Sequence, residues 1–186
     1  DRKLSLLDQA LLPQQIIYVD IKTVQDGHDA IKTMKVRGAP AIAVAGVLSL
    51  AVEMNQLEFS NSRELEQYIE KSLDVLVSAR PTAVNIFRAA NDIRKYLKQL
   101  NSEDLDVGDI KEKIILFIEK MVKLDIYDNM AIGDHGANHR VQALIANALL
   151  VLTHCNACSR ATVVYGTAVG HIRSLHKQCK LKHALC

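Results

Sequence analysis

An apolar run, Ala41–Val52, directly follows the segment Arg37-Gly38-Ala39-Pro40. Proline suits the first turn of a helix, where its missing N–H costs nothing. A helix that is apolar on nearly every face has to be buried. We therefore expect a buried helix from Pro40 to about Asn55. The run is too short to span a bilayer, so no membrane association is predicted.

The residues before this helix are typical of an anion site. Gly38 allows close backbone approach, a helix start offers unpaired N–H groups and partial positive charge, and Arg37 adds a planar donor fork. The segment Ala79–Asn85 repeats the pattern, with Arg80 directly before Pro81. We predict that Arg37 and Arg80 share one phosphate. The alternative is two turns, each followed by a helix without a ligand.

Hydrophobic periodicity predicts a mostly helical N-terminal part. Residues 1–22 are expected to be extended, with a strand at Gln15–Val19. Asn61 and Glu64 resemble a capping box. The expected helices are 24–36, 40–55, one following Asn61 to about 77, one opened by Pro81 and ending near 100, and one from about 110 that continues past 125.

The pattern of apolar residues changes in the C-terminal part. Leu149–Leu152 is expected to be a buried strand, followed by a helix that starts between 159 and 162 and ends near 176, and by a second strand at Leu181–Cys186. This order opens an α/β unit. The predicted fold class is α+β followed by α/β: a short β segment and a helical domain (1–145), then the first, incomplete part of a Rossmann-like domain (146–186). A two-stranded parallel sheet is not a finished domain.

Composition narrows the function classes. The formal net charge is +2, Trp is absent and no long basic block occurs, which predicts no nucleic-acid partner. Four cysteines in a chain of 186 residues do not form a disulfide scaffold. We therefore expect reduced thiols and a cytoplasmic location.

Cys155 is the candidate reactive thiol. It is expected where a strand ends and a helix begins, and a helix N-terminus lowers the pKa of a thiol. Two other interpretations stay open for Cys155-Asn-Ala-Cys158: a dithiol redox motif, or a zinc site completed by Cys179, Cys186 or a nearby histidine. A small buried thiol without chemistry is the plain alternative.

Taken together, colinear segments over essentially the whole chain resemble the methylthioribose-1-phosphate isomerase family of the initiation-factor-2B-like superfamily. The segments are Leu7–Gln9, Leu11–Pro13, Ala30–Ile42, Ala79–Asn85, Asp128-Asn129, Ile132-Gly133, Gly136-Ala137, Thr153–Asn156, Ala161-Thr162, Tyr165–Ala168 and Ile172–His176. The resemblance implies a sugar-phosphate isomerase of methionine salvage that is a homodimer, uses no metal or nucleotide cofactor, and is found in the cytoplasm and also the nucleus.

The resemblance also implies residue roles. Arg37, Gly38, Ala39 and Arg80 would bind the substrate, chiefly its phosphate, and Cys155 would be the active-site cysteine. The chain departs from the family pattern at Met130, Cys158 and Arg160.

The catalytic aspartate of the family is expected beyond Cys186, so we expect the chain alone to be inactive. The strands of the incomplete sheet would expose apolar surface and an open edge, so we also expect the chain to associate. Two alternatives stay open: a regulatory subunit of the guanine-nucleotide exchange factor of translation initiation, and a ribose-1,5-bisphosphate isomerase.

Overall fold

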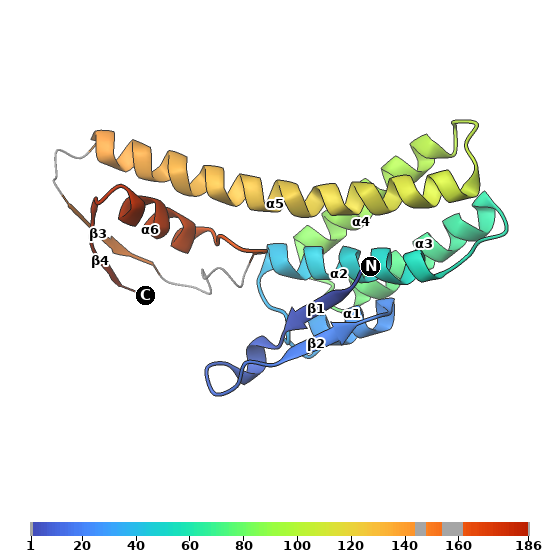
Figure 1. Cartoon of the computed structure of the whole chain (residues 1–186), viewed down its shortest axis with the longest axis horizontal. Coiled ribbons are helices and arrows are strands. Elements are labelled where there is room, and N and C mark those ends of the chain that lie inside the picture. The colour runs from blue at the N-terminus through green and yellow to red at the C-terminus, as the bar shows by residue number, and fades with distance from the viewer. Residues whose placement is uncertain (1, 144–147, 154–161, 186) are drawn as a thin grey trace. The chain divides into compact units, whose positions relative to one another are not determined.

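The structure, a computed structural model, describes residues 2–143, 148–153 and 162–185 (Figure 1). The chain forms two compact units, Asp1–Met121 and Val122–Cys186. The border between the units falls within the longest helix, α5 (Val107–Ala143), which has 37 residues. The two predicted domains, 1–145 and 146–186, stay a prediction.

The N-terminal residues form a small antiparallel hairpin. Strand β1 (Leu4–Leu7) pairs with β2 (Tyr18–Ile21), with Leu4 opposite Ile21 and Leu7 opposite Tyr18. A short 3-10 helix, η1 (Gln9–Leu11), follows β1 directly. The strand predicted at Gln15–Val19 begins three residues later, because this register leaves residues 15–17 beyond the end of β1.

Helix α1 (Val24–Lys32) begins at a capping box between Thr23 and Asp26. It ends earlier than the expected residue 36, because Met34 has a φ of 61°, which no helix continues through. Helix α2 (Ala39–Gln56) starts within one residue of its expected position and carries Pro40 in its first turn.

Two further helices are joined by a tight turn. Helix α3 (Ser62–Ser78) is capped by Asn61, whose side chain accepts the N–H of Glu64 at 3.0 Å, which is one half of the predicted capping box. The Glu64 carboxylate accepts the N–H of Ser60 at 2.7 Å and not that of Asn61, so the other half is shifted by one residue. Helix α4 (Val84–Leu100) does not start at Pro81, so that prediction is wrong. The N–H of Ala83 donates to the carbonyl of Arg80 at 2.9 Å, which closes a turn around the proline before the helix begins.

The core of the first unit surrounds α2. This helix contacts α1, α3 and α4, and Leu50 and Met54 are fully buried on it. By length and composition alone α2 is apolar enough to cross a membrane. Its packing against three helices accounts for the same composition. The first half of α5 adds Ile110, Ile114, Ile115 and Ile118 to this core.

The second unit contains a parallel βαβ arrangement, as the sequence predicts. The expected burial of its first strand is wrong, because the described residues cover only the face with Leu149 and Val151, and Leu150 and Leu152 are exposed. Strand β3 (Leu149–Leu152) pairs in parallel with β4 (Leu181–Leu185), and α6 (Ala168–Lys177) lies between them in the chain. The helix begins later than expected, because residues 162–167 form bends in which Thr162 Oγ1 accepts the N–H of Gly166 at 2.9 Å. The described chain is thus mostly helical with a few short strands.

Candidate functional site

Arg37 lies in the segment that joins α1 to α2, and its side chain points into the fold. Its Nη2 donates to the carbonyl of Gln9 at 3.2 Å. Its Nε is buried and has no hydrogen-bond partner among the residues that the structure describes. A buried donor without a partner is costly and therefore requires an explanation. A bound anion would supply the missing acceptor.

The start of α2 has the features predicted for an anion cradle. Gly38 has a φ of 96°, a left-handed conformation that favours glycine. Its carbonyl accepts the N–H of Ile42 at 2.9 Å, whereas no side chain within the described ranges caps the helix. Ala39 is exposed and is the first residue of the helix. The first N–H groups of α2 are therefore not satisfied by a capping side chain.

Arg80 is exposed and stands in the turn between α3 and α4. The structure thus places it where a loop residue can reach a ligand. The sharing of one anion between Arg37 and Arg80 stays a prediction.

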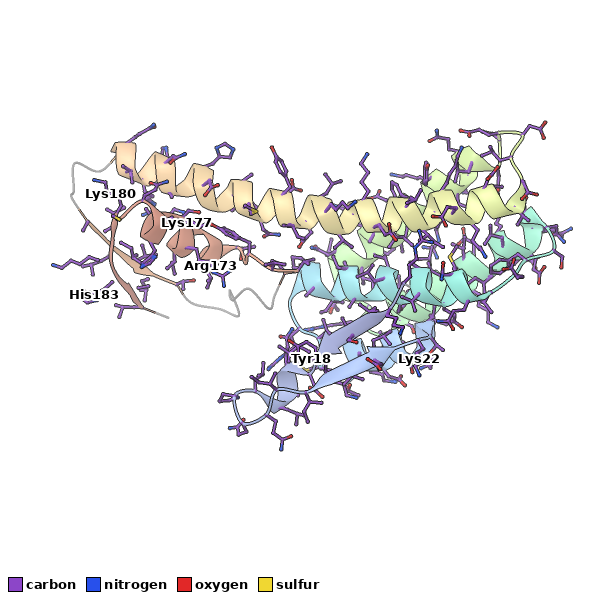
Figure 2. All side chains as sticks on the ribbon, viewed as in Figure 1. Tyr18, Lys22, Arg173, Lys177, Lys180 and His183 are labelled. Atoms are coloured by element: carbon purple, nitrogen blue, oxygen red, sulfur yellow. The ribbon has the colours of Figure 1, made fainter. Side chains whose placement is uncertain are left out.

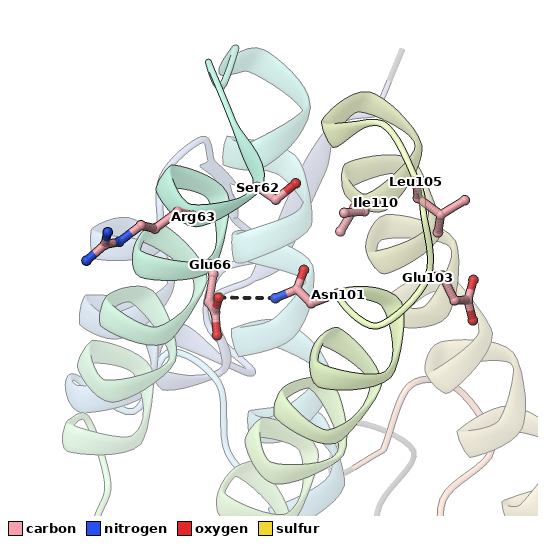
Figure 3. Close-up of a pocket in the computed structure, with 7 residues that line it drawn as sticks. All are labelled: Ser62, Arg63, Glu66, Asn101, Glu103, Leu105 and Ile110. Carbon is pink, nitrogen blue, oxygen red and sulfur yellow. Dashed lines mark hydrogen bonds between the residues drawn. The ribbon is translucent and has the colours of Figure 1, made fainter.

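A recess of about 470 Å³ lies at the other end of the α3–α4 pair (Figure 3). Its lining combines both charges and two apolar side chains: Ser62, Arg63, Glu66, Asn101, Glu103, Leu105 and Ile110. Glu66 accepts a hydrogen bond from Asn101 at 3.1 Å across it. Because α3 has 17 residues and so runs about 25 Å from this recess to the Arg80 turn, the recess is separate from the predicted site.

Most of the cysteine predictions concern residues outside the described ranges. Cys155, Cys158 and Cys186 lie outside the described residues. Cys179 is exposed, free and has a φ of 54° directly after α6. The described ranges contain no group of three side chains that could hold a metal ion. Because Cys155 and Cys158 lie outside these ranges, the redox and zinc interpretations stay open.

Tyr165, from one of the segments that carried the resemblance, organises the second unit. Its hydroxyl shares a hydrogen bond with Ser174 at 2.9 Å, and Ser174 donates to Asp134 at 2.6 Å. Figure 2 labels Arg173 and Lys177 on α6, and the charged ends of both lie over the tyrosine ring, 5.7 and 5.3 Å from its centre. These contacts fix α6 against α5 and the loop before it.

Asp8 and Gln9 belong to the Arg37 surroundings and were missed as site residues. Both are buried, with 7 and 8 % of their surface exposed. The sequence contains a signal for a turn here, because Asp8 and Gln9 stand between an extended segment and Pro13. The contact of the Gln9 carbonyl with Arg37 spans 28 residues and is not predicted by any local pattern.

Comparison with known proteins identifies relatives over nearly the whole chain. The methylthioribose-1-phosphate isomerases of Drosophila pseudoobscura pseudoobscura and Drosophila persimilis are each 46% identical to the chain over 191 residues, covering 98% of it. The alignment covers 53% of each isomerase, so the chain spans about half the length of these relatives.

Solved structures show the same relationship. 5-Methylthioribose 1-phosphate isomerase from Pyrococcus horikoshii OT3 has a TM-score of 0.86 and 34% identity, over 99% of this chain and 49% of the other. Subunit delta of translation initiation factor eIF-2B from A. fulgidus has a TM-score of 0.81 and 35% identity, over 100% of this chain and 52% of the other.

The predicted resemblance is therefore confirmed. Residues 35–186, which begin just before Arg37 and include both β3 and β4, match the initiation factor 2 subunit family. The chain belongs to the initiation factor 2 subunit family.

Proposed function

We propose that the chain carries the phosphate-binding part of an aldose–ketose isomerase that acts on 5-methylthioribose 1-phosphate. The observation that carries the proposal is the 46% identity to named isomerases over 98% of the chain. Among the described residues, the buried Nε of Arg37 has no hydrogen-bond partner and the adjacent start of α2 has no side-chain cap, which supports the proposal independently. In this proposal Arg37, Gly38, Ala39 and Arg80 bind the phosphate.

The proposed reaction moves one hydrogen from C2 of the sugar to C1, opens the ring, and leaves the phosphate on C1. No atom is gained or lost, so the reaction needs neither a redox partner nor a second substrate. Cys155 is proposed to assist proton transfer. Binding energy at the phosphate would hold C1 and C2 in place for that step.

The same proposal extends to the domains and to the assembly of the complete enzyme. The β3–α6–β4 unit would be the first part of a Rossmann-like domain, following an N-terminal domain of residues 1–145. The complete enzyme would be a cytoplasmic homodimer, without a metal or nucleotide cofactor.

Substrate binding tests the proposal. The 186-residue chain is titrated with 5-methylthioribose 1-phosphate and with ribose 1,5-bisphosphate, and the dissociation constants are measured by calorimetry. Loss of one charge-assisted hydrogen bond corresponds to about 1.5–3 kcal/mol, so Arg37→Ala should weaken binding at least about tenfold. Arg63→Ala is the matched control, because Arg63 is an exposed arginine at the far end of α3.

A second candidate is a regulatory subunit without catalytic activity. The match to the eIF-2B delta subunit, at a TM-score of 0.81, favours it. Binding that depends on Arg37 but not on Arg63 supports the isomerase. Absence of binding to either sugar phosphate, with the chain folded, contradicts the isomerase and favours the regulatory candidate.

A further inference from the structure

Two hydrogen bonds tie the η1 turn to the segment before α2. The N–H of Gln9 donates to the carbonyl of Lys35 at 2.9 Å. The carbonyl of Gln9 accepts from Arg37 Nη2 at 3.2 Å. The backbone of one residue therefore fixes both the chain just before Arg37 and the guanidinium itself.

Asp8 builds the turn that presents Gln9. Its Oδ1 accepts the N–H of Ala10 at 3.0 Å, which caps η1. Its own N–H donates to the carbonyl of Ile17 at 2.9 Å, which closes the connection between β1 and β2. Only 7 % of the surface of Asp8 is exposed, and a carboxylate is costly to bury unless it makes such bonds.

The turn thus holds the guanidinium through Nη2, while Nε keeps a donor that the turn does not use. Nη2 is used by Gln9, whereas Nε is buried without a partner in the part of the chain that the structure describes. An arginine whose planar fork is already oriented loses less freedom when it binds an anion. The orientation of Arg37 depends on the geometry of η1, and this geometry depends on Asp8.

We propose that Asp8 is a positioning residue for phosphate binding, acting on Arg37 through the backbone of Gln9. This inference rests on the proposed function of Arg37. A purely structural cap would only stabilise the fold. A positioning residue would also change the environment of the Arg37 guanidinium and the affinity for phosphate.

The test measures both properties on the 186-residue chain by NMR. The Arg37 Nε–H resonance is assigned by its disappearance in Arg37→Lys, and inorganic phosphate is the titrated probe. Asp8→Ala should move or broaden this resonance and weaken phosphate binding about fivefold, the equivalent of one lost cap. Asp8→Asn, which retains an oxygen that caps a helix, should stay within about twofold of the parent.

Asn61→Ala is the matched control. It removes the cap of α3, which is the same local interaction at a helix start far from Arg37. It should lower the stability against urea to a similar degree and leave both the resonance and the phosphate affinity unchanged. If Asp8→Ala does not fold, Asp8→Glu, whose longer side chain caps poorly, replaces it.

The outcomes separate the two levels of inference. An unchanged Arg37 resonance and affinity in Asp8→Ala, or equal effects in Asn61→Ala, would overturn the positioning role. A moved resonance with rescue by Asp8→Asn supports it. A parent chain that binds no phosphate contradicts the proposed function, while the resonance still decides whether Asp8 orients Arg37.

Discussion

Helices α1 and α2 approach so closely at Gly27 that no side chain fits there. A Cβ atom added to Gly27 would lie 2.3 Å from Ser49 Oγ and 2.6 Å from Ser49 Cβ. Ser49 is fully buried, and its hydroxyl donates to the carbonyl of Gly46 at 2.7 Å. We therefore predict that Gly27→Ala destabilises the helix pair from which the Arg37 segment emerges.

Two opposing effects set the magnitude. Replacing glycine by alanine inside a helix contributes about 1 kcal/mol of stability. Overpacking a well-filled core costs about 1–3 kcal/mol. Crowding should win, because moving Ser49 breaks its hydrogen bond and its Cβ cannot leave the helix backbone. The two figures together leave a net loss of up to about 2 kcal/mol. In a Ser49→Gly background the crowded atoms are gone, so Gly27→Ala should instead stabilise by about 0.5–1 kcal/mol.

Urea unfolding of the four proteins of this double-mutant cycle measures the effect. Gly108→Ala is the control, because Gly108 is exposed and the atom nearest its added Cβ, at 3.1 Å, is the carboxylate oxygen of Asp106. This exposed side chain has to shift by only a few tenths of an ångström, which leaves its hydrogen bond with the N–H of Gly108 in place. Gly108→Ala should be neutral or stabilising. The reasoning fails if Gly27→Ala is as stable as the parent, or if Ser49→Gly does not reverse the sign of its effect.

Three further predictions concern single side chains. Glu53 of α2 accepts the N–H of Val24 at the start of α1, so Glu53→Ala should cost about 1.5–3 kcal/mol in urea unfolding and Glu53→Gln clearly less. Burial lowers the pKa of His171, so the unfolded chain binds more protons near pH 6. Stability of the second unit should be complete above about pH 6.5 and fall as the pH is lowered, and His171→Gln should remove this dependence in pH-series thermal melts. Cys155 should react with iodoacetamide at lower pH than Cys179, as mass spectrometry of alkylated peptides would show; the reverse order would contradict a helix-start thiolate.

Local signals predicted the elements that depend on neighbours in sequence. The side chain of Asn61 caps α3 through a bond across three residues, and Pro40 lies in the first turn of α2. The strand at Leu149–Leu152 was predicted with its observed bounds. In each of these cases the residues that determine the element lie within or beside it.

The errors have two physical sources. Proline suits both the second position of a β-turn and the first turn of a helix, so the sequence around Pro81 fits either structure. In the structure Pro81 is in a β-turn, which the hydrogen bond from the N–H of Ala83 to the carbonyl of Arg80 closes. The second source is sequence separation. The contact of Gln9 with Arg37 spans 28 residues and runs through a backbone carbonyl, which carries no side-chain signature.

The two arginines that the sequence paired differ physically, and the difference bears on how a phosphate would be bound. Arg37 is partly buried and held by the Gln9 carbonyl, so much of its side-chain freedom is already lost in the folded chain. Arg80 is exposed in a turn, so binding would have to order it, and salt would screen its charge. Arg37 would then supply orientation and most of the salt-resistant affinity. Arg80 would supply attraction that weakens as ionic strength rises, and the salt dependence of phosphate binding would depend mainly on Arg80.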